Sequence, residues 1–233
     1  MGRIIAIANQ KGGVGKTTTA INLSASLASM DKKVLALDMD PQGNMTSGLG
    51  VDKDGVDKTV YDLIIGNAGI EECLCRDVLE NLDVLPSNIN LSAAEIELIG
   101  VDNKEFILRD EVKKVKDRYD FVIIDCPPAL SMLTINAMTT ADSVLVPIQC
   151  EYYALEGLSQ LTMYDARTNL SLQVVENVKD NLNQNIYKTI IPRNIRLAEA
   201  PSYGMPINLY DSKSTGAESY RLLAEEVIHK GEE

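Results

Sequence analysis

The sequence predicts an α/β fold, a doubly wound and mostly parallel sheet with helices on both faces. Short apolar runs alternate with stretches of helical periodicity, which is the order of elements that a parallel sheet requires. Glycines and aspartates follow several of the apolar runs, as expected where such sheets bind ligands. The chain has 233 residues, of which 45% are hydrophobic, and no internal repeat or flexible linker divides it. We therefore expect residues 1–233 to form a single domain.

The first strand–helix–strand unit is complete by Asp40. The run RIIAIAN leads into a glycine-rich turn and predicts a strand. The next stretch, TTTAINLSASLASM, has apolar side chains at helical spacing, as at Ala20, Leu23 and Leu27. KKVLALDMD then predicts a second strand that ends in acidic residues.

The middle of the chain predicts further strands and helices in alternation. LDVLPS is typical of a short strand, and SAAEIELI and NKEFILRDEVKKVKDRY are typical of helices. YDFVIIDCPP predicts a buried strand that ends at two prolines, because proline cannot donate to a sheet ladder. SMLTINAMTTA predicts a helix and DSVLVPIQC another strand.

The order of elements is interrupted near residue 161. There LEGLSQL runs directly into TMYDARTNLS, with no apolar strand between them. A crossover to the next parallel strand needs about 10–12 residues or more. The sheet is therefore predicted to lack one helix and one strand near this point.

The composition limits the classes of function. The formal net charge of −12 opposes general attraction to nucleic acid, so DNA binding needs a local basic patch. No membrane span or signal peptide is recognisable, and we expect a cytoplasmic protein. The four cysteines lack the spacing of a metal site and are expected to be reduced, and the single histidine, His229, is expected to be solvated or to cap a helix.

The stretch QKGGVGKTTT predicts a phosphate-binding loop. It departs from the usual pattern G-x-x-x-x-G-K-[ST] by having Gln10 in place of a glycine and an additional lysine, Lys11. Glycines let successive N–H groups point toward a phosphate, Lys16 would reach the β- and γ-phosphates, and the Thr17 hydroxyl would coordinate Mg²⁺. The alternative, a glycine-rich turn without chemical role, is disfavoured by the order strand, glycines, Lys-Thr and helix. The predicted nucleotide-binding residues of the loop are Lys11, Gly12, Gly13, Val14, Gly15, Lys16, Thr17 and Thr18.

Aspartates at the ends of two apolar strands are the candidate partners of this loop. Asp125 ends a buried strand, as a Walker B carboxylate does in order to face the magnesium shell. Its alternative is an aspartate that caps the next turn. Asp40 ends the neighbouring strand and is a candidate to orient or deprotonate the attacking water, with Asp38 as its competitor.

Five ordered motifs together resemble the ParA/Soj group of chromosome and plasmid partitioning ATPases, in the deviant Walker A class of P-loop proteins that includes MinD. They are KGGVGKTTT, DMDPQGN, DFVIIDCPP, TMYDARTNLS and IIPRNIRLAEAPSYGMPI. The resemblance implies ATP and Mg²⁺ as cofactors, with Thr17 and Asp125 at the metal. It implies that Lys16 serves its own nucleotide, that Lys11 reaches the partner's phosphates across an ATP-dependent homodimer, and that Asp40 activates water. Pro192 and Asn194 of IPRN would lie against the adenine.

The resemblance also implies a DNA-binding surface. Arg167, Arg193 and Arg196 stand in motifs whose arginines contact nonspecific double-stranded DNA in this group, although scattered surface arginines, with Lys188 nearby, are the alternative. A ParB-type partner would stimulate slow hydrolysis, and the protein would be associated with the nucleoid.

Three other functions are weighed against this one. A MinD-like positioning ATPase would attach to membranes through a basic amphipathic terminal helix, but the chain ends in GEE. A nucleotide-binding scaffold that no longer cycles is the second alternative. A nitrogenase-type reductase is disfavoured because Cys126, next to Asp125, has no suitable cysteine partner.

The segment missing near residue 161 is a departure from the family, whose members normally carry a further helix and a central strand there. The loss amounts to roughly twenty residues. The chain is either a shortened variant whose helices rearrange or a deletion that leaves the sheet incomplete. Both weaken the expectations for Pro192, Asn194 and the arginines more than those for the phosphate loop.

Overall fold

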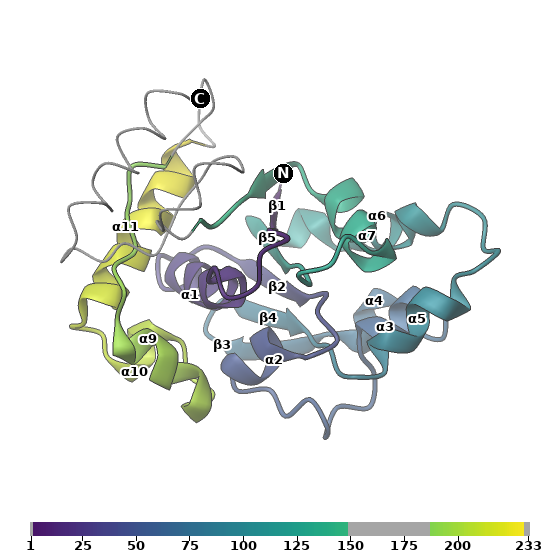
Figure 1. Cartoon of the computed structure of the whole chain (residues 1–233), viewed down its shortest axis with the longest axis horizontal. Helices are drawn as coiled ribbons and strands as arrows, with labels where there is room; N and C mark the ends of the chain where they lie inside the picture. The colour runs from purple at the N-terminus through teal and green to yellow at the C-terminus, as the bar shows by residue number, and fades with distance from the viewer. Residues whose placement is uncertain (1, 149–186, 231–233) are drawn as a thin grey trace.

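The protein folds around one sheet with helices on both faces (Figure 1). A computed structural model describes residues 2–148 and 187–230. In this part of the chain the sheet has six strands in the order β3-β4-β2-β5-β1-β6, parallel except for β3. This confirms the predicted fold class. The strands are β1 (Arg3–Ile7), β2 (Val34–Asp38), β3 (Cys75–Leu79), β4 (Leu82–Leu85), β5 (Phe121–Asp125) and β6 (Ser143–Leu145).

The helices divide between the two faces of the sheet. Figure 1 shows α1 and α11 on the left of the sheet and α3 to α7 on the right. The helices of the described residues are α1 (Lys16–Ala28), α2 (Asn44–Gly48), α3 (Val60–Ile64), α4 (Ile70–Cys73), α5 (Leu91–Glu97), α6 (Ile107–Val112), α7 (Met132–Thr140), α9 (Ile195–Glu199), α10 (Ile207–Tyr210) and α11 (Thr215–His229), with 3₁₀ turns at Lys104–Phe106, Lys116–Arg118 and Ala200–Tyr203.

Each face of the sheet has its own hydrophobic core. Successive side chains of a strand point to opposite faces, so Ile5 and Ile7 of β1 enter one core and Ile4 enters the other. Burial on both faces explains why the parallel strands are continuous apolar runs. One side of α11 packs inward, and it joins α1 in the first core through Tyr220, Leu223 and Val227.

The structure corrects two predicted elements and adds a strand, β3, to them. Strand β3 was not predicted, because its polar residues Arg76 and Asp77 hide the pattern of an antiparallel edge strand. The long helix predicted over NKEFILRDEVKKVKDRY is broken into short pieces, and the N–H groups of Lys114 and Val115 bond to carbonyls three residues back, which tightens the end of α6. The strand predicted over DSVLVPIQC ends at Leu145.

Some predictions fall outside the described residues. They are the missing helix and strand near residue 161, Cys150, and Arg167. Of the helices that the structure describes, none has the length and hydrophobicity needed to cross a bilayer.

Candidate nucleotide-binding site

The loop between β1 and α1 has the backbone conformation of a phosphate cradle. Gly13 and Gly15 have φ of 73° and 89°, in the left-handed region that favours glycine. A Cβ atom added at Gly12 or Gly13 would meet nothing within 4 Å, so open space lies beside the backbone here. Gly15 caps α1 without a side-chain hydrogen bond, which leaves the first N–H groups of the helix available to a ligand.

A hollow of about 300 Å³ lies against this loop. It brings together much of the predicted loop with one predicted aspartate, Asp40. Val14 is buried and anchors the loop in the protein. The complete lining is Gly12, Gly13, Gly15, Lys16, Thr17, Thr18, Asp40, Asn44 and Pro128, of which Asn44 and Pro128 were not predicted from the sequence.

The two lysines of the loop differ in their surroundings. Lys16 is buried, and its Nζ donates to the main-chain carbonyl of Lys11 at 3.3 Å. Lys11 is exposed, and its main-chain N–H donates to Oδ1 of Asn9 at 2.9 Å. Lys16 is thus held within the site, whereas Lys11 lies at its surface.

Asp125 is a buried carboxylate at the end of β5. Both of its carboxylate oxygens lack a hydrogen-bond partner among the described residues. The sheet register places it between Ile7 of β1 and Asp38 of β2. Burial raises the pKa of Asp125 well above the ordinary range and the charge of Asp38 adds to this, while the nearby Thr17 hydroxyl and Lys16 ammonium act in the opposite direction.

The residues around Asp125 fit a divalent cation. A buried, unpartnered carboxylate is costly, and a cation would neutralise it. Carboxylate and hydroxyl oxygens suit the hard Mg²⁺ ion, and Thr17, which also lines the hollow, supplies the hydroxyl. The chemistry of this donor set therefore agrees with the predicted metal site at Thr17 and Asp125.

Asp38 and Asp40 have different partners. Asp38 is completely buried; its Oδ2 accepts from the Thr46 N–H at 2.9 Å and from the Thr46 hydroxyl at 2.8 Å, and its Oδ1 accepts from the Asp40 N–H at 3.1 Å. Burial raises the pKa of Asp38 to about 6, although these hydrogen bonds lower it. Asp40 lines the hollow, and its Oδ1 accepts from the Gln42 N–H. Only Asp40 of the two faces the space where a nucleotide would lie.

Ser87 completes a polar network that sequence reasoning missed. Its N–H donates to the Thr46 hydroxyl oxygen at 2.9 Å, and its own hydroxyl donates to the main-chain carbonyl of Asp40 at 2.8 Å. A Cβ atom at Gly43, where φ is 62°, would lie 2.7 Å from the Ser87 carbonyl oxygen. The stretch from Asp38 to Thr46 and the residue after β4 are thus joined behind Asp40, and the position of Ser87 just after β4 was the only signal in the sequence.

Pro192 and Asn194 do not line the hollow at the loop. Asn194 instead caps α9: its Oδ1 accepts from the Arg196 N–H at 2.8 Å, and its Nδ2 donates to the Thr215 hydroxyl at 3.0 Å. The contact of Pro192 and Asn194 with an adenine base stays a prediction.

The two described arginines of the predicted DNA surface are both exposed. Arg196 pairs with Glu199 at 2.9 Å and lies 3.7 Å from Asp211. Arg193 makes no ion pair within residues 2–148 and 187–230. The structure thus distinguishes an arginine held by local acids from one that is not.

Cys126 and His229 have the surroundings of structural residues. Cys126 is buried, and burial raises the pKa of its thiol, so it is held as an unreactive thiol. In the described part of the chain no group of His, Cys, Asp and Glu could hold a metal ion by itself. His229 lies in the last turn of α11, with its Nδ1 2.7 Å from the Glu225 carbonyl oxygen.

Comparison with known proteins identifies the family. The sequence model of a family described as an AAA domain matches residues 2–187. The sporulation initiation inhibitor protein Soj of Bacillus subtilis (strain 168) is 53% identical, with 99% of this chain and 100% of that protein covered. The chromosome-partitioning ATPase Soj of Treponema pallidum (strain Nichols) is 46% identical, with 98% of each covered. The crystal structure of cobyrinic acid a,c-diamide synthase from Mycobacterium smegmatis with bound ADP and magnesium has a TM-score of 0.86 and 33% identity, with 100% of this chain and 96% of that chain covered.

The relatives also bear on the length of the chain. The alignment with the Bacillus subtilis protein spans 253 positions, whereas this chain has 233 residues, so at least 20 aligned positions have no residue here. This agrees with the predicted loss of roughly twenty residues. Identity of this level over almost the whole of both proteins means that the chain belongs to the AAA-domain family and, within it, to the ParA/Soj partitioning ATPases.

Proposed function

We propose that this chain is an ATP-driven molecular switch for DNA partitioning. ATP and Mg²⁺ bind at the β1–α1 loop and drive formation of a homodimer, and the dimer binds nonspecific double-stranded DNA of the nucleoid. Hydrolysis, stimulated by a ParB-type partner, releases it. The observation that carries the proposal is Asp125, a buried carboxylate without a hydrogen-bond partner in the described residues, at the end of the strand beside β1.

The loop residues would hold the nucleotide. N–H groups of the loop and of the first turn of α1 would donate to the phosphates, and Lys16 would add a fixed positive charge. Thr17 and Asp125 would hold Mg²⁺, directly or through water. When bound, the ion supplies neutralisation of the negative charge on the phosphate oxygens.

Asp40 would prepare the attacking water. Its carboxylate lies at the hollow, while its main-chain N–H and carbonyl are fixed by Asp38 and Ser87. A carboxylate in this position can accept a proton or a hydrogen bond from water and so orient it. Asp38 is already engaged by three donors, and we assign it the task of positioning Asp40.

Lys11 would act on the nucleotide of the partner subunit. Its exposed position at the surface of the site suits contact with a second molecule. A second cation at the phosphates stabilises the charge that develops in phosphoryl transfer, as an arginine finger does. This makes dimerisation depend on ATP.

Arg167, Arg193 and Arg196 would bind DNA in the dimer. The ion pairs of Arg196 are exposed and therefore weak, so a DNA phosphate can replace Glu199 or Asp211. Two subunits double the number of phosphate contacts, which raises the affinity and its salt dependence. An acidic chain can thus bind DNA only when ATP holds it as a dimer.

The first experiment is size-exclusion chromatography with light scattering on Asp40→Ala protein. This variant should bind ATP without hydrolysing it, and we expect a monomer that becomes a dimer only with ATP and Mg²⁺. Adding Lys11→Ala should keep it monomeric although ATP still binds, and adding Lys16→Ala should abolish both. A folded monomer of Asp40→Ala under both conditions would reject the switch and favour a nucleotide-binding scaffold.

DNA binding is tested separately on the same background with a duplex of arbitrary sequence. Arg193→Glu should weaken ATP-dependent binding by roughly tenfold or more at moderate salt, because a phosphate contact is replaced by repulsion. Lys113→Glu makes the same charge reversal on an exposed side chain just after α6 and serves as the matched control. Equal losses in both variants would show that only net charge matters.

A further inference from the structure

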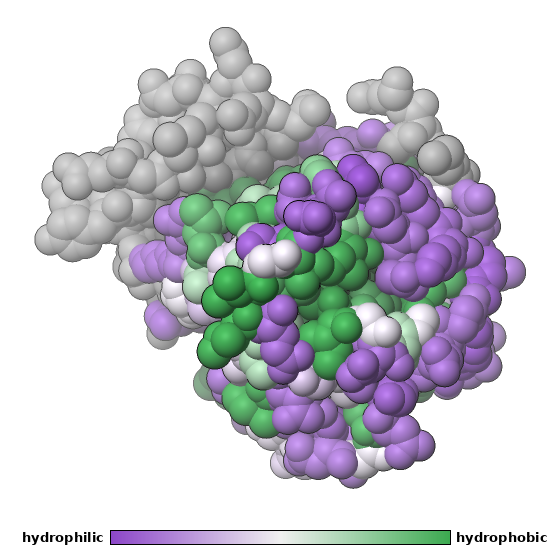
Figure 2. Space-filling view, turned by 90° about the vertical axis from the view of Figure 1, so that its right-hand side faces the viewer, coloured by the Kyte–Doolittle hydropathy of each residue, from purple (hydrophilic) through white to green (hydrophobic). Residues whose placement is uncertain are grey.

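A second surface, separate from the hollow at the phosphate loop, carries exposed apolar side chains. Ile96 and Ile99 are 73% and 74% exposed, and Ile89 and Val101 are also exposed. Figure 2 looks onto this side of the molecule and shows hydrophobic residues gathered in its middle, with hydrophilic residues around them. A contiguous apolar patch with a polar rim is typical of an interaction site.

The patch arises because α5 and the turn after it are apolar on two sides. Leu91, Ala94 and Leu98 point inward and belong to the second core. Ile96 and Ile99 lie on the other side and contribute nothing to that core. The packing of α5 on the second core therefore does not account for these two exposed isoleucines.

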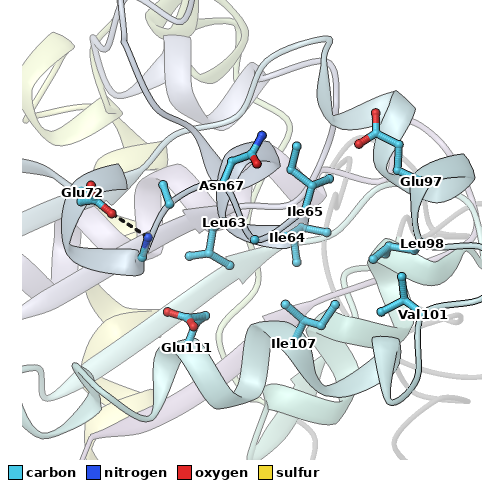
Figure 3. Close-up of a pocket in the computed structure, with 13 residues that line it drawn as sticks. Leu63, Ile64, Ile65, Asn67, Glu72, Glu97, Leu98, Val101, Ile107 and Glu111 are labelled. Carbon is cyan, nitrogen blue, oxygen red and sulfur yellow. Dashed lines mark hydrogen bonds between the residues drawn. The ribbon is translucent and has the colours of Figure 1, made fainter.

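A groove of about 640 Å³ lies next to this patch. Val101 lines the groove, whereas Ile96 and Ile99 only neighbour its lining residues Glu97 and Leu98 in the sequence. Figure 3 shows Leu63, Ile64 and Ile65 facing Ile107 across it. Its walls come from α3, the turn into α4, the end of α5 with the following turn, and α6. It shares no residue with the hollow at the phosphate loop.

The polar side chains that line the groove are mostly acidic. Glu72 and Glu111 lie toward one end and Glu97 toward the other (Figure 3), and no Lys or Arg is among the described residues that line it. Glu111 has an ion pair with Lys114, which stands outside the groove. Glu72 accepts from the Gly69 N–H at 2.9 Å and Glu97 accepts from the Tyr61 hydroxyl at 3.0 Å.

Two of these carboxylates differ from Glu111 in their partners. Glu72 and Glu97 have no cationic partner in the part of the chain that the structure describes. Because each makes one hydrogen bond to a neutral donor, each retains free lone pairs for a cation. The groove therefore offers an apolar floor between negative ends.

The apolar floor and the acidic ends of the groove favour one class of ligand over the others. A second copy of this chain would bring two acidic rims together and would suffer like-charge repulsion. An anionic ligand is disfavoured for the same reason. An amphipathic segment with Lys or Arg near its apolar side chains can pack on the apolar floor and pair with the acidic rim, as helices do when they dock in grooves.

We infer that the groove between α3 and α6, with the exposed Val101 at its edge, docks a cationic amphipathic segment of a partner protein. Apolar side chains of that segment lie over Leu63, Ile65 and Ile107, and its basic residues pair with Glu72 and Glu97. Docking at this groove does not depend on the proposed nucleotide switch.

The test uses the full chain and a synthetic 18-residue peptide with Leu and Lys at helical spacing, labelled with fluorescein and followed by anisotropy. Val101→Ser should weaken binding by about tenfold, because it removes an exposed apolar side chain that lines the groove. Ile195→Ser is the matched control, since Ile195 is 76% exposed but lies on α9. It should bind as the unaltered chain does.

The charge requirement is tested in parallel. Glu97→Gln should weaken binding and reduce its dependence on salt, whereas Glu80→Gln, which removes the same charge outside the groove, should change neither. Lys16→Ala should bind the peptide normally, so failure of the nucleotide switch and failure of this proposal are distinguishable. No saturable binding by the unaltered chain, or equal losses in groove and control variants, would overturn the proposal.

Discussion

The nucleotide site and the groove beside α5 are built in opposite ways. At the nucleotide site, charged groups such as Asp38 and Asp125 are buried, and a network of hydrogen bonds holds the loop that carries Asp40. Near the groove, apolar side chains such as Ile96 and Ile99 are exposed and do not belong to either hydrophobic core. Buried charge costs stability and marks chemistry, whereas exposed apolar surface costs little folding stability and marks recognition. Substitutions at the nucleotide site should therefore change ATP binding or stability, whereas substitutions near the groove should change partner binding and leave stability almost unaltered.

The largest effect is expected at Lys16. Lys16→Ala removes the fixed cation beside the phosphate cradle, and ATP binding should weaken by at least about 100-fold. Lys213→Ala, an exposed lysine after α10, is the control and should bind ATP normally. Titration with a fluorescent ATP analogue and Mg²⁺ measures both. Similar affinities would mean that the loop N–H groups alone hold the nucleotide.

Thr46→Val should cost about 2–3 kcal/mol in the free energy of unfolding, because it removes a donor to buried Asp38 and leaves the Ser87 N–H without its acceptor. Thr46→Ser keeps the hydroxyl and should recover most of the loss. Urea unfolding of the three proteins gives the comparison. If the serine variant is as unstable as the valine variant, the methyl group rather than the network accounts for the effect.

Asp125→Asn should have two effects of opposite sign. Because the folded-state pKa of Asp125 is raised, its ionised form is less favourable in the folded than in the unfolded chain, and stability is lost as pH rises through that pKa. Removing the charge should therefore stabilise the metal-free protein by about 1–2 kcal/mol, a rise of a few degrees in Tm. The stabilisation that Mg²⁺ and ATP add should shrink. Thermal melts at neutral pH, with and without Mg²⁺ and ATP, measure both, and a lower Tm in the metal-free variant would contradict the assignment.

The smallest effect on stability is expected near the groove. Ile96→Ser should change the free energy of unfolding by less than about 0.5 kcal/mol, since the side chain packs on nothing in the core. Leu98→Ser, two residues away but buried, should cost several times more. Urea unfolding of this pair compares the two sides of the same segment. A large loss at Ile96 would mean that it supports the fold and is not reserved for a partner.

The conformation of the β1–α1 loop could be predicted from the sequence, whereas the groove could not, for physical reasons. The β1–α1 loop follows from local chemistry, because glycines, Lys16 and Thr17 appear in a fixed order between a strand and a helix. The choice between Asp38 and Asp40 could not be made, because it depends on Thr46 and Ser87, which come from other segments. Periodicity predicted a helix at α5, but an apolar residue on a helix does not show whether the core or a partner covers it.

The parts of the fold that were missed share a similar origin. Strand β3 is stabilised by pairing with β4 and not by its own apolar pattern, since Arg76 and Asp77 are exposed. The break in the helix around α6 depends on tertiary packing that overrides local propensity. Both features depend on contacts with other segments of the chain, which a local sequence pattern does not reveal.

The hydrogen bonds behind Asp40 limit how hydrolysis can be controlled. The N–H and the carbonyl of this residue are both occupied, by Asp38 and Ser87, so its main chain is fastened at two points. Among residues 2–148 and 187–230, its carboxylate is restrained by one hydrogen bond, from the Gln42 N–H, which is worth about 0.5–1.5 kcal/mol. Rotation of one side chain is thus far easier than displacement of the loop. In the function proposed above, a stimulating partner would therefore accelerate hydrolysis by turning the Asp40 carboxylate toward water while the backbone stays in place.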